Sequence, residues 1–136
     1  MFKRKAAVLL VVLAALVVTV PTFAIQRLNQ PLTYTSSVYR EIYEDTDWLN
    51  GPGDYWDYGA TLSGGRTYKF QLIVPWGRDF DIKIYDENGH LVASGTNGTG
   101  ENETVYVTPA WTGHFTIRVF SYSGSGWYTL KVYRKL

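Results

Sequence analysis

The sequence predicts an all-β protein, an antiparallel β-sandwich of about seven to eight strands. The first observation is the alternation of apolar and polar side chains in residues 80–85, the two-residue period of a strand with one buried face. The second is the recurrence of such short stretches, separated by turn-forming residues, from residue 55 to residue 133. The third is that no helical periodicity interrupts them.

A basic and then apolar segment opens the chain. Residues 3–5 are Lys-Arg-Lys, residues 6–20 are apolar except for Thr19, and residues 21–24 read Pro-Thr-Phe-Ala. This order predicts a secretory signal peptide over residues 1–24. The alternative is an uncleaved apolar helix that anchors the chain in a membrane through residues 6–23, a run that is short for a span of about 20 residues. Both alternatives predict a secreted or cell-surface protein.

Composition limits the classes of partner. Without residues 1–24 the chain has 136 − 24 = 112 residues, enough for one domain, with 13 − 3 = 10 Lys and Arg against 12 Asp and Glu. The net charge of 10 − 12 = −2 predicts no nucleic-acid partner. The chain has no cysteine, so a core, a metal or a partner must stabilise it. Aromatic residues make up 16% of the chain, more than a small core absorbs, so we expect rings on the surface.

After the signal, residues 25–53 are interpreted as a linker or edge segment with an acidic cluster. Residues 38–47 have the length of a short helix, but their dense acids and the Asn-Gly-Pro-Gly turn at 50–53 argue against it. Residues 54–136 are interpreted as the β-sandwich domain. Its predicted strands are residues 55–62, 67–74, 80–85, 91–94, 103–107, 114–120 and 127–133. Between the third and fourth of these, Asn88-Gly89 predicts a type I′ turn and therefore a hairpin.

Six acidic residues without an intervening Lys or Arg form the first candidate site: Glu41, Glu44, Asp45, Asp47, Asp54 and Asp57. Ca²⁺ takes about six to eight oxygen ligands from carboxylates and carbonyls, and turn-rich acidic backbone supplies both. The alternative is a solvated acidic loop without a metal. Asp79 and Asp81 are a weaker pair, since alternation makes them ordinary outward charges.

An aromatic face is the second candidate site. If Phe80, Ile82 and Ile84 face the core, alternation turns several rings and cations outward: Tyr85, Phe120, Trp127 and Tyr133, with Lys83, Arg118 and Lys131. Flat rings among polar groups suit an extracellular polysaccharide or an extended polypeptide. The alternative is that the N-terminal segment, a partner protein or self-association covers this face, because exposed rings favour aggregation.

The sequence also contains two motifs for N-glycosylation but no catalytic motif. Asn97-Gly98-Thr99 and Asn102-Glu103-Thr104 both fit the acceptor pattern for N-glycosylation, which predicts glycans at Asn97 and Asn102 if the cell modifies exported proteins. No catalytic motif is found. The two histidines, His90 and His114, belong to no recognisable Ser-His-Asp or zinc-binding pattern. We therefore expect no enzyme. The lesser alternative is a peptidase or a glycosidase, for which Asp54 and Asp57 would be the paired carboxylates.

The order of several motifs resembles a known family. An acidic segment is followed by GDYWDYGATLSGGRTYKFQL, by DFDIKIYDENGHLVASG, by TGHFTIRVF and finally by GWYTLKVY, over residues 41–133. This resembles the bacterial and archaeal pre-peptidase C-terminal domain, which is related to the collagen-binding domains of clostridial collagenases. The resemblance implies a jelly-roll-like β-sandwich of the kind appended to secreted proteases. No protease domain accompanies it here, so we expect a free-standing copy.

The resemblance also implies a calcium site between the segment before the first core strand and the GD-x-x-D stretch. Asp54 and Asp57 match that stretch best, followed by Glu44 and Asp45. We therefore expect an exported, non-catalytic binding or accessory domain, stabilised by Ca²⁺, that contacts protein or polysaccharide through its aromatic face. The alternative is a structural subunit or stabilising partner of an extracellular assembly.

Overall fold

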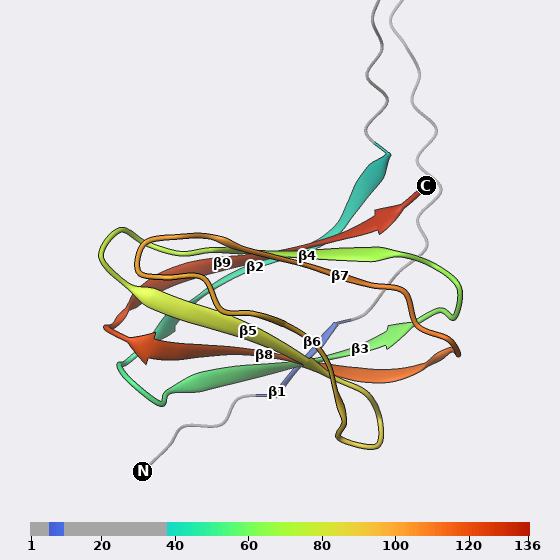
Figure 1. The fold of residues 1–136 in the computed structure, drawn as a ribbon, viewed down its shortest axis with the longest axis horizontal. Helices are drawn as coiled ribbons and strands as arrows, with labels where there is room; N and C mark the ends of the chain where they lie inside the picture. Colours follow the sequence, from blue (N-terminus) through green and yellow to red (C-terminus); the bar gives the residue numbers. More distant parts are fainter. Residues whose placement is uncertain (1–5, 10–37) are drawn as a thin grey trace, which may run out of the picture.

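The structure is a computed structural model that describes residues 38–136 and the backbone of residues 6–9. These residues form nine strands in two sheets (Figure 1). The first sheet has the strand order β1-β3-β8-β5-β6, and the second sheet has the order β2-β9-β4-β7. The strands are β1 Ala6–Leu9, β2 Tyr39–Leu49, β3 Tyr55–Leu62, β4 Tyr68–Ile73, β5 Asp79–Tyr85, β6 Leu91–Gly95, β7 Glu103–Val107, β8 Gly113–Ser123 and β9 Gly126–Lys135.

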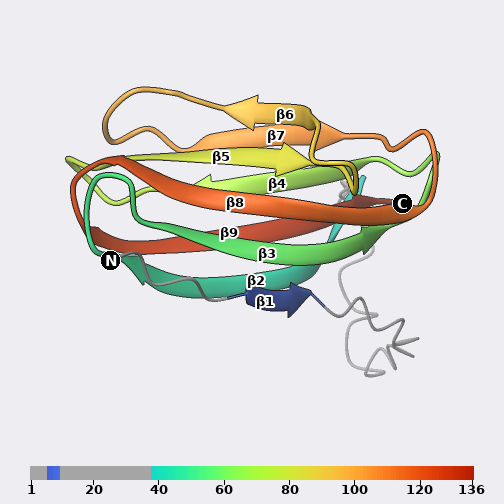
Figure 2. The same cartoon turned by 90° about the horizontal axis from the view of Figure 1, so that it is seen from below.

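The two sheets lie face to face, with the second sheet above the first in Figure 1. Figure 2 shows that the strands of both layers run in nearly the same direction, as in an aligned sandwich. Neighbouring strands are antiparallel, apart from β1, which runs parallel to β3. The predicted antiparallel β-sandwich is therefore confirmed for the described residues.

The predicted signal peptide or apolar helix lies almost entirely outside the described residues. Of residues 1–24 only 6–9 are described, and their backbone forms β1, with Ala6 opposite Asp57. Residues 25–37 also lie outside the described part. Within the part that is described, no helix has the length and apolar character needed to cross a membrane.

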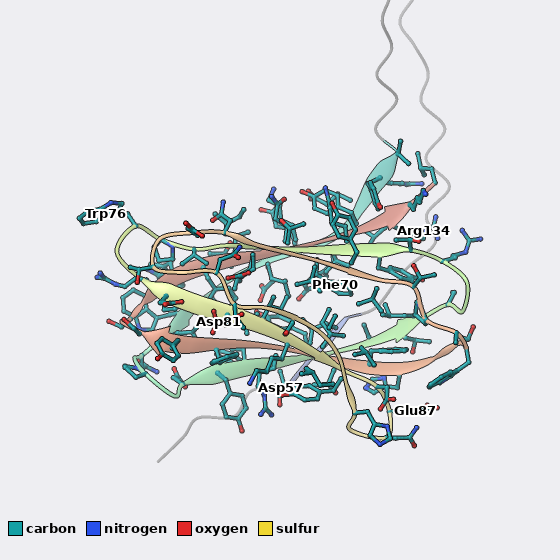
Figure 3. All side chains as sticks on the ribbon, in the orientation of Figure 1. Asp57, Phe70, Trp76, Asp81, Glu87 and Arg134 are labelled. Carbon is teal, nitrogen blue, oxygen red and sulfur yellow. The ribbon has the colours of Figure 1, made fainter. Side chains whose placement is uncertain are left out.

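The core fills the space between the sheets, with Phe70 near its middle (Figure 3). The alternation predicted for β5 is confirmed, because Phe80, Ile82 and Ile84 are each at most 1% exposed. The same period buries every second residue on the other core strands, because side chains alternate between the faces of a sheet. On β4, β8 and β9 these are Tyr68, Phe70, Leu72, Phe115, Ile117, Val119, Tyr128, Leu130 and Val132.

Two tyrosine hydroxyls meet inside this core. The Oη atoms of Tyr58 on β3 and Tyr128 on β9 lie 2.5 Å apart, and the Tyr58 hydroxyl also donates to Oδ2 of Asp45 at 2.9 Å. Burial raises the pKa of both phenols, so both stay neutral. These hydrogen bonds join the two sheets, because Tyr58 belongs to the first sheet and Tyr128 and Asp45 to the second.

Replacing Tyr58 with phenylalanine should lower the free energy of unfolding by about 1–3 kcal/mol, because the Tyr128 hydroxyl and the Asp45 carboxylate lose a buried partner. Urea unfolding measures the change. Tyr122→Phe is the matched control, since that ring is 69% exposed, and we expect a change within about 0.5 kcal/mol. Equal effects of the two substitutions would contradict a structural role for the buried hydroxyl.

The hairpin between β5 and β6 has a different turn from the predicted one. A type I′ turn requires positive φ at both central residues, but only Gly89 has it, at 80°. The Gly89 N–H instead donates to the carbonyl of Asp86 at 3.0 Å, and the Asp86 carboxylate accepts the N–H groups of Asn88 and His90. The buried Asp86 side chain therefore organises this turn.

The acidic segment contains a regular strand. β2 occupies Tyr39–Leu49 and pairs with β9 along its length, with one irregularity between Glu41 and Tyr43. It is an edge strand of the second sheet, so the sandwich includes part of the segment interpreted as a linker or edge. Between Glu41 and Asp57, the only residues outside the strands β2 and β3 are residues 50–54, which contain the turn.

Candidate functional site

The outer face of the first sheet brings together several predicted site residues. β8 lies between β3 and β5, and the register sets Arg118 of β8 between Asp57 of β3 and Lys83 of β5. In the neighbouring row Phe120 lies opposite Tyr55. Tyr85 projects from β5 on the same side. We call Tyr55, Asp57, Lys83, Tyr85, Arg118 and Phe120 the Arg118 face.

Arg118 is held in a fixed orientation at the centre of this face. Its Nε and one terminal nitrogen donate to the two carboxylate oxygens of Asp57, each at 2.8 Å. This two-point contact raises the pKa of the guanidinium, so Arg118 stays charged. The guanidinium carbon lies 4.1 Å from the centre of the Tyr55 ring and 5.9 Å from that of Tyr85. The Arg118 cation is therefore preorganised between two rings. The Arg118 and Asp57 side chains are both partly exposed, so a ligand can reach them.

Lys83 adds a second cation to the face. Its Nζ lies 4.9 Å from the centre of the Phe120 ring, within the range of a cation–π contact. Because Lys83 and Arg118 are neighbours in register, the two positive charges lie side by side. Of these two cations, only Arg118 forms an ion pair with a carboxylate among the described residues. The part of the face around Lys83 is therefore positively charged.

Two hollows meet on this face. One, of about 270 Å³, is lined by Gly53, Tyr55, Lys83, Tyr85, Arg118 and Phe120. The other, of about 460 Å³, shares Tyr85 and Arg118 and continues to Asp57, Asp86, Glu87, Gly89, His114 and Thr116. The first hollow is cationic and aromatic, whereas the second ends among carboxylates. Together they have the size of a site for a ligand of a few residues or sugar units.

Gly59 shapes the second hollow. A Cβ built on Gly59 would lie 3.0 Å from Cε1 and 3.1 Å from Nε2 of His114, so the bare glycine leaves room for the histidine ring. His114 and Tyr55 were not predicted as site residues. Tyr55 and Asp57 are two residues apart on β3, so strand alternation places both on the same face, and this signal was available in the sequence.

Two of the predicted aromatic residues lie elsewhere. Trp127 and Tyr133 belong to β9 and therefore to the outer side of the second sheet, opposite the Arg118 face. Trp127 is 61% exposed and contacts the Trp48 ring edge to face, with centres 5.5 Å apart. The Tyr133 ring has Nζ of Lys69 at 4.0 Å. The single aromatic face expected from the sequence is thus wrong, because alternation separates inward from outward but does not say to which sheet a strand belongs.

The six predicted calcium ligands are held apart by strand alternation. On β2, Glu44 faces outward, whereas Asp45 and Asp47 share the side of the buried Leu49. Asp57 lies on the other sheet. Within residues 38–136, no group of three or more His, Asp or Glu side chains is arranged to hold a metal ion.

Each of these acids also has a partner within the protein. Nζ of Lys131 lies 2.9 Å from Glu44 and 3.6 Å from Glu41, and its contact lowers the pKa of Glu44. Asp54 accepts the backbone and side-chain N–H groups of Asn50. The remaining contacts are Asp45 with Tyr58, Asp47 with the N–H of Trp48, and Asp57 with Arg118. Calcium binding by this set stays a prediction, and the described residues provide no preformed site for it.

The predicted glycosylation sites lie in the loop between β6 and β7. Asn97 and Asn102 are both exposed, and Nδ2 of Asn97 donates to the backbone carbonyl of Asn102 at 2.8 Å. The Asn102 side chain accepts the N–H of Val74 at 2.9 Å. A glycan on Asn97 would therefore displace a hydrogen bond that closes the loop. Modification of either residue stays a prediction.

Comparisons with known proteins place the fold. No family model matches the chain. The pre-peptidase C-terminal domain of a collagenase from Bacillus anthracis is similar in structure, with a TM-score of 0.54 and 19% identity over 66% of this chain and 87% of that one. PliG from Aeromonas hydrophila, a periplasmic inhibitor of g-type lysozyme, has a TM-score of 0.55 and 10% identity over 98% of this chain and 100% of its own. The resemblance to pre-peptidase C-terminal domains is confirmed at the level of the fold.

Proposed function

We propose that this chain is a non-catalytic domain that works outside the cytoplasm and binds an extended segment of another protein on its Arg118 face. The observation that carries the proposal is the Arg118 guanidinium, fixed by Asp57 between the Tyr55 and Tyr85 rings. Binding sites are rich in such rigid aromatic and arginine groups, since little conformational entropy is lost when a ligand contacts them.

Charge favours a polypeptide over a neutral polysaccharide. The two hollows offer cations at Lys83 and Arg118 and the exposed carboxylate of Glu87, so a chain with mixed charges finds complementary groups along the face. The fold supports the proposal as well, since similar sandwiches are the pre-peptidase C-terminal domain of a collagenase and a periplasmic inhibitor of g-type lysozyme. A neutral polysaccharide could stack on the rings and hydrogen-bond to the polar groups, but it would bring no charge to match those of Lys83 and Arg118.

The test is retention on immobilised ligands. Purified protein is passed over fibrous proteins, secreted hydrolases and neutral and acidic polysaccharides, and we expect retention by a protein that weakens as salt rises, because salt screens the charges. Retention by a neutral polysaccharide alone, independent of salt, would contradict the choice of a polypeptide.

Replacing Tyr85 with alanine should weaken that binding about tenfold, because the ring lines both hollows. Surface plasmon resonance measures the change with the retained protein. Tyr106→Ala is the matched control, since Tyr106 is 56% exposed on β7 of the second sheet and should leave the affinity unchanged. Equal losses from both variants would place the ligand elsewhere.

A structural role in an extracellular assembly is the second candidate, and exposed tryptophans favour it. Trp48 and Trp127 form an exposed pair on the second sheet, and Trp76 is 93% exposed on the loop after β4 (Figure 3). Sedimentation velocity over a range of concentrations tests this role. Self-association that Trp127→Ser abolishes, together with no retention on the ligand panel, would favour it over the first proposal.

A further inference from the structure

The outer side of the second sheet carries aromatic rings at both ends and polar side chains between them. On β9 the buried residues are Tyr128, Leu130 and Val132, so alternation turns the residues between them outward. The register with β2, β4 and β7 sets further outward side chains beside these. We call this surface the β9 face, and it has Trp48 and Trp127 at one end, Thr129 and Lys131 in the middle, and Tyr106 and Tyr133 at the other end.

The rings of the β9 face form two separate groups. Trp48 and Trp127 lie opposite each other in register and are 37% and 61% exposed. At the other end the Tyr106 ring is 56% exposed, and its centre lies 6.0 Å from that of the Tyr39 ring. Trp127 and Tyr133 are separated by six positions on β9, so the two groups lie about 20 Å apart along the strands.

Hydrogen-bonding groups lie between the two groups of rings. The Oγ1 atoms of Thr46 and Thr129 are 2.8 Å apart, so these two hydroxyls bond to each other. A hydroxyl offers one donor and two acceptor sites, so each threonine keeps sites for a ligand. Gln71 lies beside Lys131 in register and adds an amide that can both donate and accept. A ligand that stacks on the rings would therefore meet polar groups along the way.

The charges of the β9 face balance, unlike those of the Arg118 face. Nζ of Lys131 lies 2.9 Å from Glu44 and 3.6 Å from Glu41. A second cation, Nζ of Lys69, lies 4.0 Å from the centre of the Tyr133 ring. These two cations and two carboxylates cancel, so a strongly charged polymer gains little from this face.

This arrangement favours a polysaccharide over a second copy of the chain. Protein–protein interfaces place an apolar centre inside a polar rim. The β9 face has the opposite order, with the ion-paired Lys131 in its middle and rings at its ends. A linear polysaccharide presents apolar ring faces and hydroxyls along its whole length. It can therefore stack at both ends of the face and hydrogen-bond in the middle.

We propose that the β9 face binds a linear, neutral polysaccharide, which stacks on Trp48 and Trp127 at one end and on Tyr106 at the other. The site lies on the opposite side of the sandwich from the Arg118 face, as the two layers in Figure 1 show. It does not depend on the polypeptide proposed for the Arg118 face. With both sites occupied, the domain would hold a protein against a polysaccharide.

Depletion of the purified chain from solution by insoluble cellulose, chitin and mannan tests the proposal. We expect at least one of them to bind the chain equally well at low and at high salt, because the face has no net charge for salt to screen. Trp127→Ala should weaken this binding about tenfold or more, and Trp127→Phe should keep most of it, since a phenyl ring still stacks. Tyr85→Ala, on the Arg118 face, is the matched control and should bind the polysaccharide as the unmodified chain does.

Soluble oligosaccharides of the retained polysaccharide test whether both ends of the face take part. The affinity should rise with length until an oligosaccharide spans the distance of about 20 Å between the two groups of rings. Tyr106→Ala should remove the gain for long oligosaccharides and leave the affinity for a disaccharide unchanged. Isothermal titration calorimetry measures both, and an affinity that does not depend on length would overturn the two-ended site.

Three other outcomes would overturn the proposal. The first is that none of the three polysaccharides binds the chain, and the second is that Trp127→Ala binds as well as the unmodified chain. The third is self-association, or retention by a protein, that Trp127→Ala abolishes while no polysaccharide is bound. That result would assign the β9 face to a second copy or to a protein partner.

Discussion

Replacing Phe70 with alanine is expected to lower the free energy of unfolding by about 3–5 kcal/mol. Phe70 is fully buried on β4, an inner strand of the second sheet, and its neighbours in register are Val105 on β7 and Val132 on β9. Removing the ring costs its transfer free energy and leaves a cavity that two sheets of fixed spacing cannot close. A domain with a stability of about 5–15 kcal/mol would be left marginal.

Urea unfolding followed by tryptophan fluorescence measures this change, and the midpoint should fall while the slope stays the same. Thr104→Ala is the matched control, because Thr104 is exposed on the neighbouring strand β7 and its loss should matter by no more than about 0.5 kcal/mol. A loss below about 1 kcal/mol for Phe70→Ala would mean that the core is not centred on this ring.

Replacing Arg118 with alanine is expected to weaken binding of the retained protein by about 30-fold or more, equivalent to about 2 kcal/mol. Two effects add. The ligand loses the fixed guanidinium, and the Asp57 carboxylate is left without its two-point partner, so it repels acidic groups on the ligand. Arg118→Lys should recover only part of the loss, because an ammonium group cannot make the paired contact with Asp57.

Lys131→Ala is the matched control for this experiment. Lys131 is also a half-buried cation paired with carboxylates, those of Glu41 and Glu44, but it lies on the second sheet. Its removal should leave the affinity unchanged, and isothermal titration calorimetry measures both variants. A similar loss in Lys131→Ala and Arg118→Ala would show that net charge, and not the Arg118 face, determines the affinity.

Much of the fold could be predicted because the core strands alternate cleanly. Phe80, Ile82 and Ile84 have the period of a half-buried strand, and hydrophobic burial enforces it. β2 could not be found in this way. Asp45 and Asp47 occupy positions on the side of the buried Leu49, so apolar residues do not alternate along this strand. The Asp45 carboxylate accepts a hydrogen bond from the Tyr58 hydroxyl of the other sheet, and this contact exists only after folding.

The candidate site was predicted in part for the same reason. Alternation found Lys83, Tyr85, Arg118 and Phe120, which do share one face. The acidic cluster and the GD-x-x-D resemblance made Asp57 a candidate calcium ligand, and no local pattern predicts its ion pair with Arg118, which is 61 residues further along the chain. Strand order decides such pairings, and local patterns do not contain it. The buried position of Asp81 escaped prediction likewise, since outward residues are exposed only where no loop or side chain covers them.

The pairing of β2 with β9 has a consequence for how the chain acquires its structure. These strands lie near opposite ends of the described domain, and the contact between Thr46 and Thr129 spans 83 positions. β9 is also the partner of β4, so the second sheet cannot assemble until the last strand has been synthesised. Folding should therefore be a late and slow event, on the order of milliseconds to seconds. A chain shortened before Gly126 would expose the edges of β2 and β4 together and remain open to proteolysis.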